Sequence, residues 1–504
     1  MWMGKRVIRR ALVGFVVLGL VSLLGCGGGG GGGGSGGGGS SGGGGSSGGG
    51  GGGTTPTTKT VSGTAASGRP LDSAVIYLKD SKGSVTYTIA DRYGQFSFDT
   101  SNLTPPFYLK TQEFRLFSYA EEAGTANITP LTTAVVAVAN GGNPDIYTNP
   151  PSQLNITPAE DSLKALIDPV LQRYDVQDAY LITTSFEANG RGMDAVLDSI
   201  WISVNEDNQT IEIQNPFTGE TIGRGTFSNG TIESSDPVTQ GEADSLPNSV
   251  THRKYFAYVK DAYGSPEQGP SMTDVVMGED GKIYVTITNT EGDTGDMFFI
   301  YGNGIKNENS IQFTAAVVLC SDTDPNGTAT AEFTGTIGQN GDMAGDFTNI
   351  LSQGDECREN NSNIYGGTWR AEDVTDALPA EVSGTYDGYA TPDGGWQEEG
   401  PVQVEITQNN ATINVSITPI GQDTPVTGKG TVYGNYVIFR TPIILGRDAS
   451  GNAKAEYATF FGKFDDKTNT ITGWYGDGVP PGDYDKDTDG NKTRARGIFR
   501  AIKR

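Results

Sequence analysis

From residue 60 to the C terminus, the chain is divided into short segments in which apolar and polar residues alternate. Turn-forming pairs such as Asn-Gly, Asp-Gly and Gly-Asn separate these segments at spacings of about 8–12 residues. Alternation with a period of two is typical of strands that bury one face, and such turns join antiparallel neighbours. The sequence therefore predicts a mainly β fold.

The C-terminal half contains two copies of one pattern, at 274–372 and 382–504. The segments that match between the copies are 331–335 with 458–462, 343–347 with 471–475, 367–371 with 497–501, and 283–287 with 402–406. Regular turns within each copy suit an up-and-down barrel or a sandwich. We assign two tandem antiparallel β-meander or barrel-like units to residues 251–372 and 378–504.

Residues 60–110 carry the pattern of a small sandwich, with strands expected at 74–78, 87–89 and 95–98. The strings Val-Ser-Gly at 61–63, Gly-Arg-Pro-Leu at 68–71 and Asp-Arg-Tyr-Gly-Gln-Phe at 91–96 resemble the carboxypeptidase regulatory-like (transthyretin-like) domain family. The resemblance implies a prealbumin-like β-sandwich over 57–125. It also implies an accessory module, often carbohydrate-binding-like, and it implies no peptidase.

Residues 126–250 are the least β-like part of the chain, and they predict a small α/β middle region. Thr129-Pro130 predicts the start of a helix that ends at Gly141. Residues 157–160 match a capping box, and Pro169 should split the helix that follows. A short helix near 193–197 and a hairpin of 200–204 with 210–213 complete the region.

The N terminus has the layout of a bacterial secretory signal over residues 1–26. Four basic residues precede an apolar run at 11–24, which is too short to span a membrane. The string Leu-Leu-Gly-Cys at 23–26 resembles the bacterial lipobox. The resemblance implies a lipid on Cys26, and Gly27 implies export to the outer membrane or surface of a Gram-negative bacterium.

A tether over residues 27–56 follows the signal. Residues 27–53 consist of 22 glycines and 5 serines, so they bury no apolar surface and are expected to be disordered. Such a chain has a root-mean-square reach of about 30 Å. The alternative is a low-complexity repeat of unselected length.

The body of the protein is acidic. The first 26 residues hold four of the 35 basic residues and none of the 60 acidic ones, so the remainder carries 31 positive against 60 negative charges, a net charge of −29. A charge of this sign repels phosphate backbones, which makes nucleic acid an unsuitable partner. The expected partners are the membrane, through the lipid, and a glycan or another envelope protein.

Besides Cys26, the chain contains Cys320 and Cys357, an even pair that predicts one disulfide in an exported protein. The chain has one histidine, which excludes metal sites built from several histidines. The cysteine at 357 and an aspartate run at 483–491 fall in the same connection of the two copies. We expect both to restrain that loop.

Calcium is the one cofactor that the sequence suggests. From Asp485 onward, the aspartate run fits the D-x-D-x-D-G start of a calcium loop. Its candidate ligands are Asp483, Asp485, Asp487, Asp489 and Asn491. Position 12 of such a loop is Arg496 instead of glutamate, which excludes an EF-hand. The alternatives are a looser calcium turn and a solvated acidic hairpin.

Three aromatic residues, Trp396, Trp474 and Tyr475, are candidates for an exposed platform that binds a sugar or another small ligand. Aromatic faces stack on sugar rings, and neighbouring carboxylates accept hydrogen bonds from hydroxyls. However, Trp474 and Tyr475 are adjacent on an expected strand, so they point to opposite faces and one belongs in the core.

No complete catalytic constellation is present in the sequence. The motifs G-x-S-x-G, H-E-x-x-H and the phosphate loop are absent, and His252 has no nucleophile motif nearby. The residues favour a non-enzyme, although 60 acidic residues leave a two-carboxylate glycosidase open.

The favoured function is therefore a lipid-anchored, non-catalytic binding or structural protein of the cell envelope, presented on a flexible stalk. One alternative is a carbohydrate-binding surface lipoprotein. Another is a small-ligand barrel, since residues 383–388 and the closing Gly-x-Phe/Trp-x-Ala pattern resemble lipocalin- or avidin-like barrels. A hollow C-terminal unit would favour the ligand barrel, and a filled one the favoured function.

Overall fold

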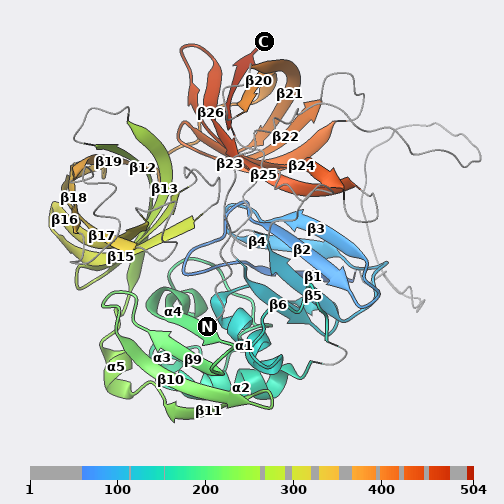
Figure 1. The fold of residues 1–504 in the computed structure, drawn as a ribbon, viewed down its shortest axis with the longest axis vertical. Helices are drawn as coiled ribbons and strands as arrows, with labels where there is room; N and C mark the ends of the chain where they lie inside the picture. Colours follow the sequence, from blue (N-terminus) through green and yellow to red (C-terminus); the bar gives the residue numbers. More distant parts are fainter. Residues whose placement is uncertain are drawn as a thin grey trace, which may run out of the picture.

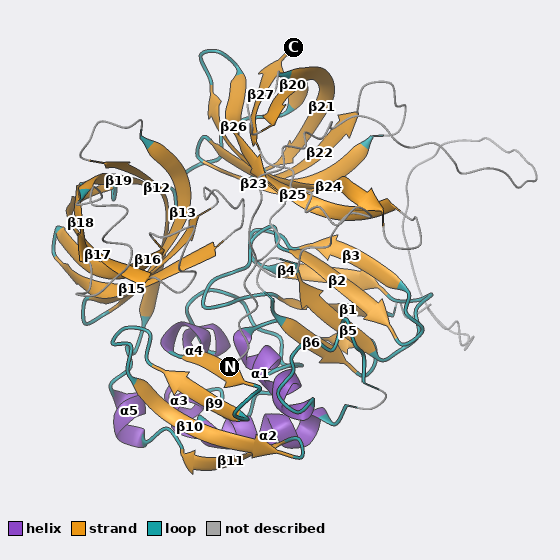
Figure 2. Cartoon of the chain, in the orientation of Figure 1, coloured by secondary structure: helices purple, strands orange, loops and turns teal. Residues whose placement is uncertain are grey.

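The computed structural model describes residues 59–112, 115–151, 154–261, 267–289, 298–318, 328–350, 366–392, 398–418, 425–447, 453–476 and 497–504. These residues form two sheets near the N terminus, a helical region with a third sheet, and two closed barrels (Figure 1). Strands dominate all parts except the helical region (Figure 2). The predicted mainly β fold is confirmed.

The N-terminal part is a sandwich of a three-stranded and a four-stranded sheet. The first sheet has the order β4-β1-β7, with β1 (Thr60–Thr64), β4 (Gln95–Asp99) and β7 (Gly124–Thr125). The second has the order β3-β2-β5-β6, with β2 (Val75–Asp80), β3 (Val85–Ile89), β5 (Phe107–Thr111) and β6 (Phe117–Ala120). Alternation sets the buried face, because Phe96 and Phe98 of β4 are buried while their neighbours are exposed.

In the described part of the middle region, five helices combine with a sheet of order β11-β10-β9-β8. The helices are α1 (Pro130–Ala139), α2 (Ile156–Leu166), α3 (Asp168–Arg173), α4 (Met193–Ser199) and α5 (Gln240–Asp244). The strands are β8 (Trp201–Asn205), β9 (Thr210–Gln214), β10 (Thr221–Ser228) and β11 (Thr231–Asp236).

Two helix boundaries agree with the sequence predictions. Thr129 caps α1: its hydroxyl accepts from the amide of Thr132 at 3.1 Å, and its own amide donates to the Thr132 hydroxyl at 2.8 Å. Helix α2 ends at Leu166 and α3 begins at Asp168, so the break falls just before Pro169.

The predicted capping box at 157–160 is wrong. Helix α2 begins at Ile156, two residues before Pro158, and the Asn155 side chain makes no capping hydrogen bond. The Glu160 carboxylate is turned away from the helix and accepts hydrogen bonds from the backbone amides of Leu181 and Ile182. These amides lie in a packed loop with no helical partner, so the buried carboxylate satisfies them instead of the helix terminus.

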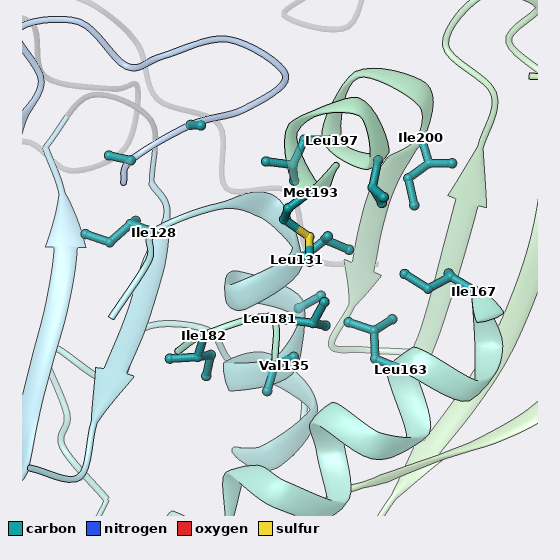
Figure 3. Packing of buried hydrophobic residues seen from close by; sticks show 14 of the residues in the cluster. Ile128, Leu131, Val135, Leu163, Ile167, Leu181, Ile182, Met193, Leu197 and Ile200 are labelled. Atoms are coloured by element: carbon teal, nitrogen blue, oxygen red, sulfur yellow. The ribbon is translucent and has the colours of Figure 1, made fainter. Parts of the chain in front are cut away.

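One continuous apolar core joins the sandwich to the helical region. Figure 3 shows Leu131 and Val135 of α1 packed between Ile182 on one side and Leu163 of α2 on the other. Met193 and Leu197 of α4 close the same cluster from above. The buried faces of the helices therefore share one apolar core with the sandwich.

Residues 250–373 form the first barrel, which is closed by eight antiparallel strands in sequence order. The strands are β12 (Val250–Asp261), β13 (Gln268–Gly278), β14 (Lys282–Asn289), β15 (Phe298–Asn307), β16 (Ser310–Val318), β17 (Thr328–Ile337), β18 (Met343–Ile350) and β19 (Gly367–Asp373). Each strand pairs with its neighbours, and β19 returns to β12.

Residues 384–503 form the second barrel with the same connectivity. Its strands are β20 (Gly384–Pro392), β21 (Glu399–Asn409), β22 (Thr412–Thr418), β23 (Val426–Tyr433), β24 (Tyr436–Arg447), β25 (Ala453–Asp465), β26 (Thr470–Gly476) and β27 (Gly497–Lys503). Strand β27 pairs with β20 and closes the barrel.

Strand register shows that the barrels are two copies of one unit. Phe333 pairs with both Phe313 and Phe347, just as Phe460 pairs with both Phe439 and Tyr475. Three of the four sequence matches thus occupy equivalent positions: 331–335 with 458–462, 343–347 with 471–475, and 367–371 with 497–501.

The fourth match, 283–287 with 402–406, is wrong. Residues 283–287 lie on β14, the third strand of their barrel, whereas 402–406 lie on β21, the second strand. Val404 faces Tyr386 across β20 and β21, and its counterpart is Thr273, which faces Tyr255. Both segments are simple alternations of β-branched and polar residues, so their sequences fit either strand.

Aromatic side chains fill the middle of both barrels. Phe313 and Phe333 stack with centroids 4.7 Å apart and an interplanar angle of 3°, and Trp369 meets Phe313 edge-on. The equivalent Phe439 and Phe460 stack with the same 4.7 Å and 3°, with Phe499 edge-on. The barrel centres are therefore packed cores instead of channels.

Candidate functional site

One end of the first barrel is open and forms a cavity of about 710 Å³. Its wall includes Val275, Ile311 and Met343, which are apolar, and Arg253 and Tyr255, which are polar. The cavity is bounded by the start of β12 and by the turn that joins β17 to β18. It lies beyond the aromatic layer that fills the barrel centre.

The alternation of β12 sends its side chains to two different places. Arg253 and Tyr255 face the barrel interior, together with Thr251. His252 and Lys254 face outward, toward the other parts of the molecule. A single strand thus lines the cavity on one side and builds an interface on the other.

Arg253 is fixed at the cavity wall. Its Nε donates to Asp373 Oδ2 at 2.6 Å, and the Asp373 side chain is only 3% exposed. Burial alone would lower the pKa of Arg253, but the hydrogen bond and charge of Asp373 outweigh it and raise this pKa. Burial raises the pKa of Tyr255 to about 12. Both groups therefore keep their protons at neutral pH and act as hydrogen-bond donors.

The same end of the second barrel is closed. Val382 occupies the position equivalent to Thr251 and is completely buried. The Tyr386 hydroxyl donates to the Val382 carbonyl at 2.6 Å, and the Gln408 side chain accepts from the Val382 amide at 2.8 Å. The residues before β20 are thereby held across the barrel end.

Two further exchanges distinguish the closed end from the open one. Phe464 stands where the first barrel has Ile337, since Phe464 pairs with Ile471 as Ile337 pairs with Met343. Gly384 stands where the first barrel has Arg253. The cavity therefore arises from particular residues of one copy, and the repeated barrel fold does not require it.

A second cluster of polar side chains is buried where α4 meets β12. His252 Nε2 lies 2.7 Å from Asp198 Oδ2, and one oxygen or nitrogen from each of Asp194, Asp198 and His252 lies within 4.8 Å of the others. The two aspartates are four residues apart on α4, on one face of the helix. Both aspartates are fully buried.

Burial and charge shift all three groups in this cluster. Burial, followed by the charge of Asp198, raises the pKa of Asp194 to about 7. Burial also raises the pKa of Asp198 well above its usual value. Burial lowers the pKa of His252, which outweighs the opposing charge of Asp194.

A loop between β1 and β2 joins the sandwich to both barrels. Arg69 forms an ion pair with Asp274 of the first barrel. Asp72 accepts a hydrogen bond from the Thr431 hydroxyl of the second barrel at 2.8 Å, and another from Tyr433. The barrels also meet directly, because the hydroxyls of Tyr258 and Tyr436 lie 2.7 Å apart.

Most of the predicted site residues lie outside the described residues. These are Cys26, Cys320, Cys357, Trp396, Asp483, Asp485, Asp487, Asp489 and Asn491. The predictions of a lipid anchor, a disulfide and a calcium turn thus remain predictions.

The structure places Trp474 and Tyr475 on opposite faces of β26, as predicted. Tyr475 points into the second barrel, where it is 4% exposed and stacks on Phe460 at 5.4 Å. Trp474 points outward and stacks on Phe461 at 5.4 Å, within the apolar contact between the barrels. One of the two residues was expected in the core, and it is Tyr475, so Tyr475 is not part of an exposed platform.

Sequence reasoning missed both the cavity and the buried Asp-Asp-His cluster. Only the D-x-x-x-D spacing on an expected helix and the single histidine pointed to the cluster. Nothing in the sequence joined the two, since 54 residues separate Asp198 from His252.

Comparison with known proteins gives little further information. No protein-family model matches the chain, and no curated protein matches it. A solved structure of a candidate outer membrane protein from Bacteroides fragilis is 14% identical in sequence, with a TM-score of 0.17. The match covers 51% of this chain and 97% of the Bacteroides chain. A variant of the vaccine antigen transferrin binding protein B from Haemophilus parasuis shares 8% identity, covers 58% and 82%, and also has a TM-score of 0.17. Scores this low carry no argument about fold or function.

Within the described residues, none of the helices combines the length and apolar character needed to cross a membrane.

Proposed function

We propose that this chain is a non-catalytic binding protein of the bacterial cell envelope. In this proposal, a lipid on Cys26 holds it to the outer membrane, and the Gly/Ser tether lets the body stand clear of the surface. The open end of the first barrel binds a small amphipathic molecule. The ligand contacts the apolar wall and accepts hydrogen bonds from Arg253 and Tyr255.

The observation that carries the ligand site is the difference between the two barrel ends. The first has a cavity of about 710 Å³, which is within the range of small-molecule sites. The second fills the same place with Val382 and Phe464. A duplicated unit that is closed in one copy and open in the other supports a binding role for the open copy.

The cavity wall can orient a ligand through donated hydrogen bonds. Arg253 and Tyr255 are protonated near neutral pH at their ordinary pKa values, and their raised pKa values keep them so. Glu279 also lines the cavity and adds a carboxylate to its wall.

The carbohydrate alternative has less support. Tyr475 is in the barrel core and Trp474 is in the contact between barrels, so neither offers a free face to a sugar ring. This alternative now rests on Trp396 and on the resemblance of the N-terminal sandwich. Glycan-array binding by the full chain would favour it.

Filling the cavity tests the proposal. The variant Ile337→Phe copies the residue of the closed barrel and should weaken binding of an uncharged fluorescent probe such as Nile red. The matched control is Ile305→Phe, which places the same ring on the outer surface at a residue that is 46% exposed. We expect about a tenfold or greater loss of affinity for the first variant only. Equal binding by both variants would overturn the assignment of the site.

The remaining parts of the proposal have their own tests. Mass spectrometry of the unreduced protein should show Cys320 joined to Cys357 and a lipid on Cys26. Calcium titration by calorimetry should give heat if residues 483–491 bind the ion. Free thiols at Cys320 and Cys357 would refute the disulfide. An unmodified N terminus would refute the lipid anchor, and the absence of heat would refute calcium binding.

A further inference from the structure

The buried cluster of Asp194, Asp198 and His252 has unsatisfied ligand atoms. Among the described residues, no hydrogen-bond partner is found for Asp194 Oδ1 or Asp198 Oδ1, although both side chains are fully buried. Their other oxygens are used: Asp194 Oδ2 accepts from the Gly190 amide at 2.6 Å, and Asp198 Oδ2 meets His252. Buried carboxylate oxygens normally have partners, so these two require an explanation.

The loop that carries Gly68 covers the two aspartates, while the His252 side chain is 27% exposed. A Cβ atom at Gly68 would lie 2.8 Å from the Tyr284 hydroxyl and 3.0 Å from Asp198 Oδ1, so the loop of the sandwich covers the cluster closely. The nearest cations are already paired with another carboxylate, because both Arg69 and Lys254 contact Asp274. The two aspartates are therefore left without a fixed counter-charge of their own.

We propose that Asp194, Asp198 and His252 bind one divalent transition-metal ion, such as Zn²⁺. Two carboxylates and one imidazole are a ligand set that such ions accept, whereas Ca²⁺ and Mg²⁺ prefer oxygen ligands alone. Two carboxylate charges and a divalent ion sum to zero, which removes the cost of a buried net charge. The proposal is independent of the ligand site in the first barrel.

The ion would join two parts of the molecule. Asp194 and Asp198 belong to α4 of the middle region, and His252 belongs to β12 of the first barrel. Since β12 also lines the cavity through Arg253 and Tyr255, the ion would fix the strand from its outer face. With three protein ligands, one position of a tetrahedral ion would stay open to water, and the ion would hold α4 and β12 together.

The single histidine allows a direct test on the full chain, purified without a polyhistidine tag. Adding Zn²⁺ should shift the imidazole signals of ¹⁵N-histidine-labelled protein and raise the melting temperature. Ca²⁺ should leave the imidazole signals unchanged. Unshifted imidazole signals at saturating Zn²⁺ would overturn the proposal, and so would Zn²⁺ binding at another acidic segment alone.

Variants give a second and independent readout. Asp194→Asn and Asp198→Asn should each weaken Zn²⁺ binding by about 100-fold or more, because each removes a charged ligand. The control is Asp207→Asn, at an exposed turn residue, which should bind Zn²⁺ as the unchanged chain does. If the aspartates are held only by a shared proton, Asp194→Asn will match the control, and the metal site is refuted.

Discussion

Each barrel is packed around a small group of aromatic side chains, whose rings contact one another in the barrel interior. Phe439 is 4% exposed and contacts both Phe460 and Phe499. Removing its ring leaves a cavity that the closed barrel cannot collapse around. The stability of the second barrel should therefore depend strongly on this one residue.

We expect Phe439→Ala to lower the free energy of unfolding by about 3–5 kcal/mol. Urea denaturation of the full chain, followed by circular dichroism, measures this loss. Ile498→Ala serves as the control because Ile498 is 62% exposed, and it should change stability by less than about 0.5 kcal/mol. Similar losses in both variants would mean that the aromatic layer does not hold the barrel.

At this scale the sequence was informative where alternation alone decides a residue's position. The opposite faces of Trp474 and Tyr475 followed from their adjacency on a strand. Glu160 was misassigned because its carboxylate is used by amides some twenty residues away, which no local pattern shows. Asp198 and His252 could not be paired for the same reason, since their contact depends on how α4 meets β12.

Single elements depend on local chemistry, and α1 is the clearest case. The Thr132 amide donates to the hydroxyl of Thr129, and the Thr129 amide donates to the Thr132 hydroxyl. Thr129 itself is buried. Buried helix ends need such partners because water cannot replace them. Thr129 therefore fixes the start of the helix that carries the shared core.

Thr129→Ala should destabilise the protein by about 1–2 kcal/mol, since it removes the cap from a buried helix end. Thr129→Ser keeps the hydroxyl and should restore most of the loss. Thermal melts of the three proteins make the comparison. If serine and alanine destabilise equally, the methyl group and not the cap is responsible.

Elements were predictable to the extent that their ends carry chemical signals. Thr129-Pro130 and Pro169 marked helix boundaries correctly because proline and capping residues act locally. The start of α2 lacks a side-chain cap, so its boundary was misplaced. The confusion of β14 with β21 shows that strands of similar composition can be ordered only by their pairing partners.

At the scale of the whole molecule, a charged group links the two barrels. Glu372 of β19 accepts from the Tyr436 hydroxyl at 2.6 Å and pairs with Lys463 Nζ at 3.0 Å, both in the second barrel. Arg370 of its own strand lies 2.8 Å away. Burial would raise the pKa of Glu372, but these hydrogen bonds outweigh burial and lower it.

A carboxyl group whose pKa is lowered by folding stabilises the folded state at pH values above its usual pKa. This stabilisation is lost as the pH falls through the lowered pKa. Glu372→Gln should therefore have a lower free energy of unfolding than the unchanged protein at pH 7, with a gap of about 1 kcal/mol between them. The gap should close as the pH falls below about 4. Glu405→Gln, on the exposed face of β21, should show no gap at either pH. A gap that persists in acid would rule out this ionic link.

The architecture of the whole chain was largely predictable, because turn spacing and repetition are spread over many residues. Which barrel is open was not predictable. That property depends on Val382 and Phe464 in one copy and on Thr251 and Ile337 in the other, within otherwise equivalent units. Small differences in side-chain volume at one end decide it.

The loop that carries Arg69 and Asp72 has a mechanical consequence. Because it contacts both barrels, a force applied at Lys59 enters the sandwich and is divided between them through several bonds at once. The two barrels therefore share the applied force, whereas barrels connected one after the other would each carry all of it. A force applied through the tether should rotate the whole folded part as one unit before it unfolds either barrel.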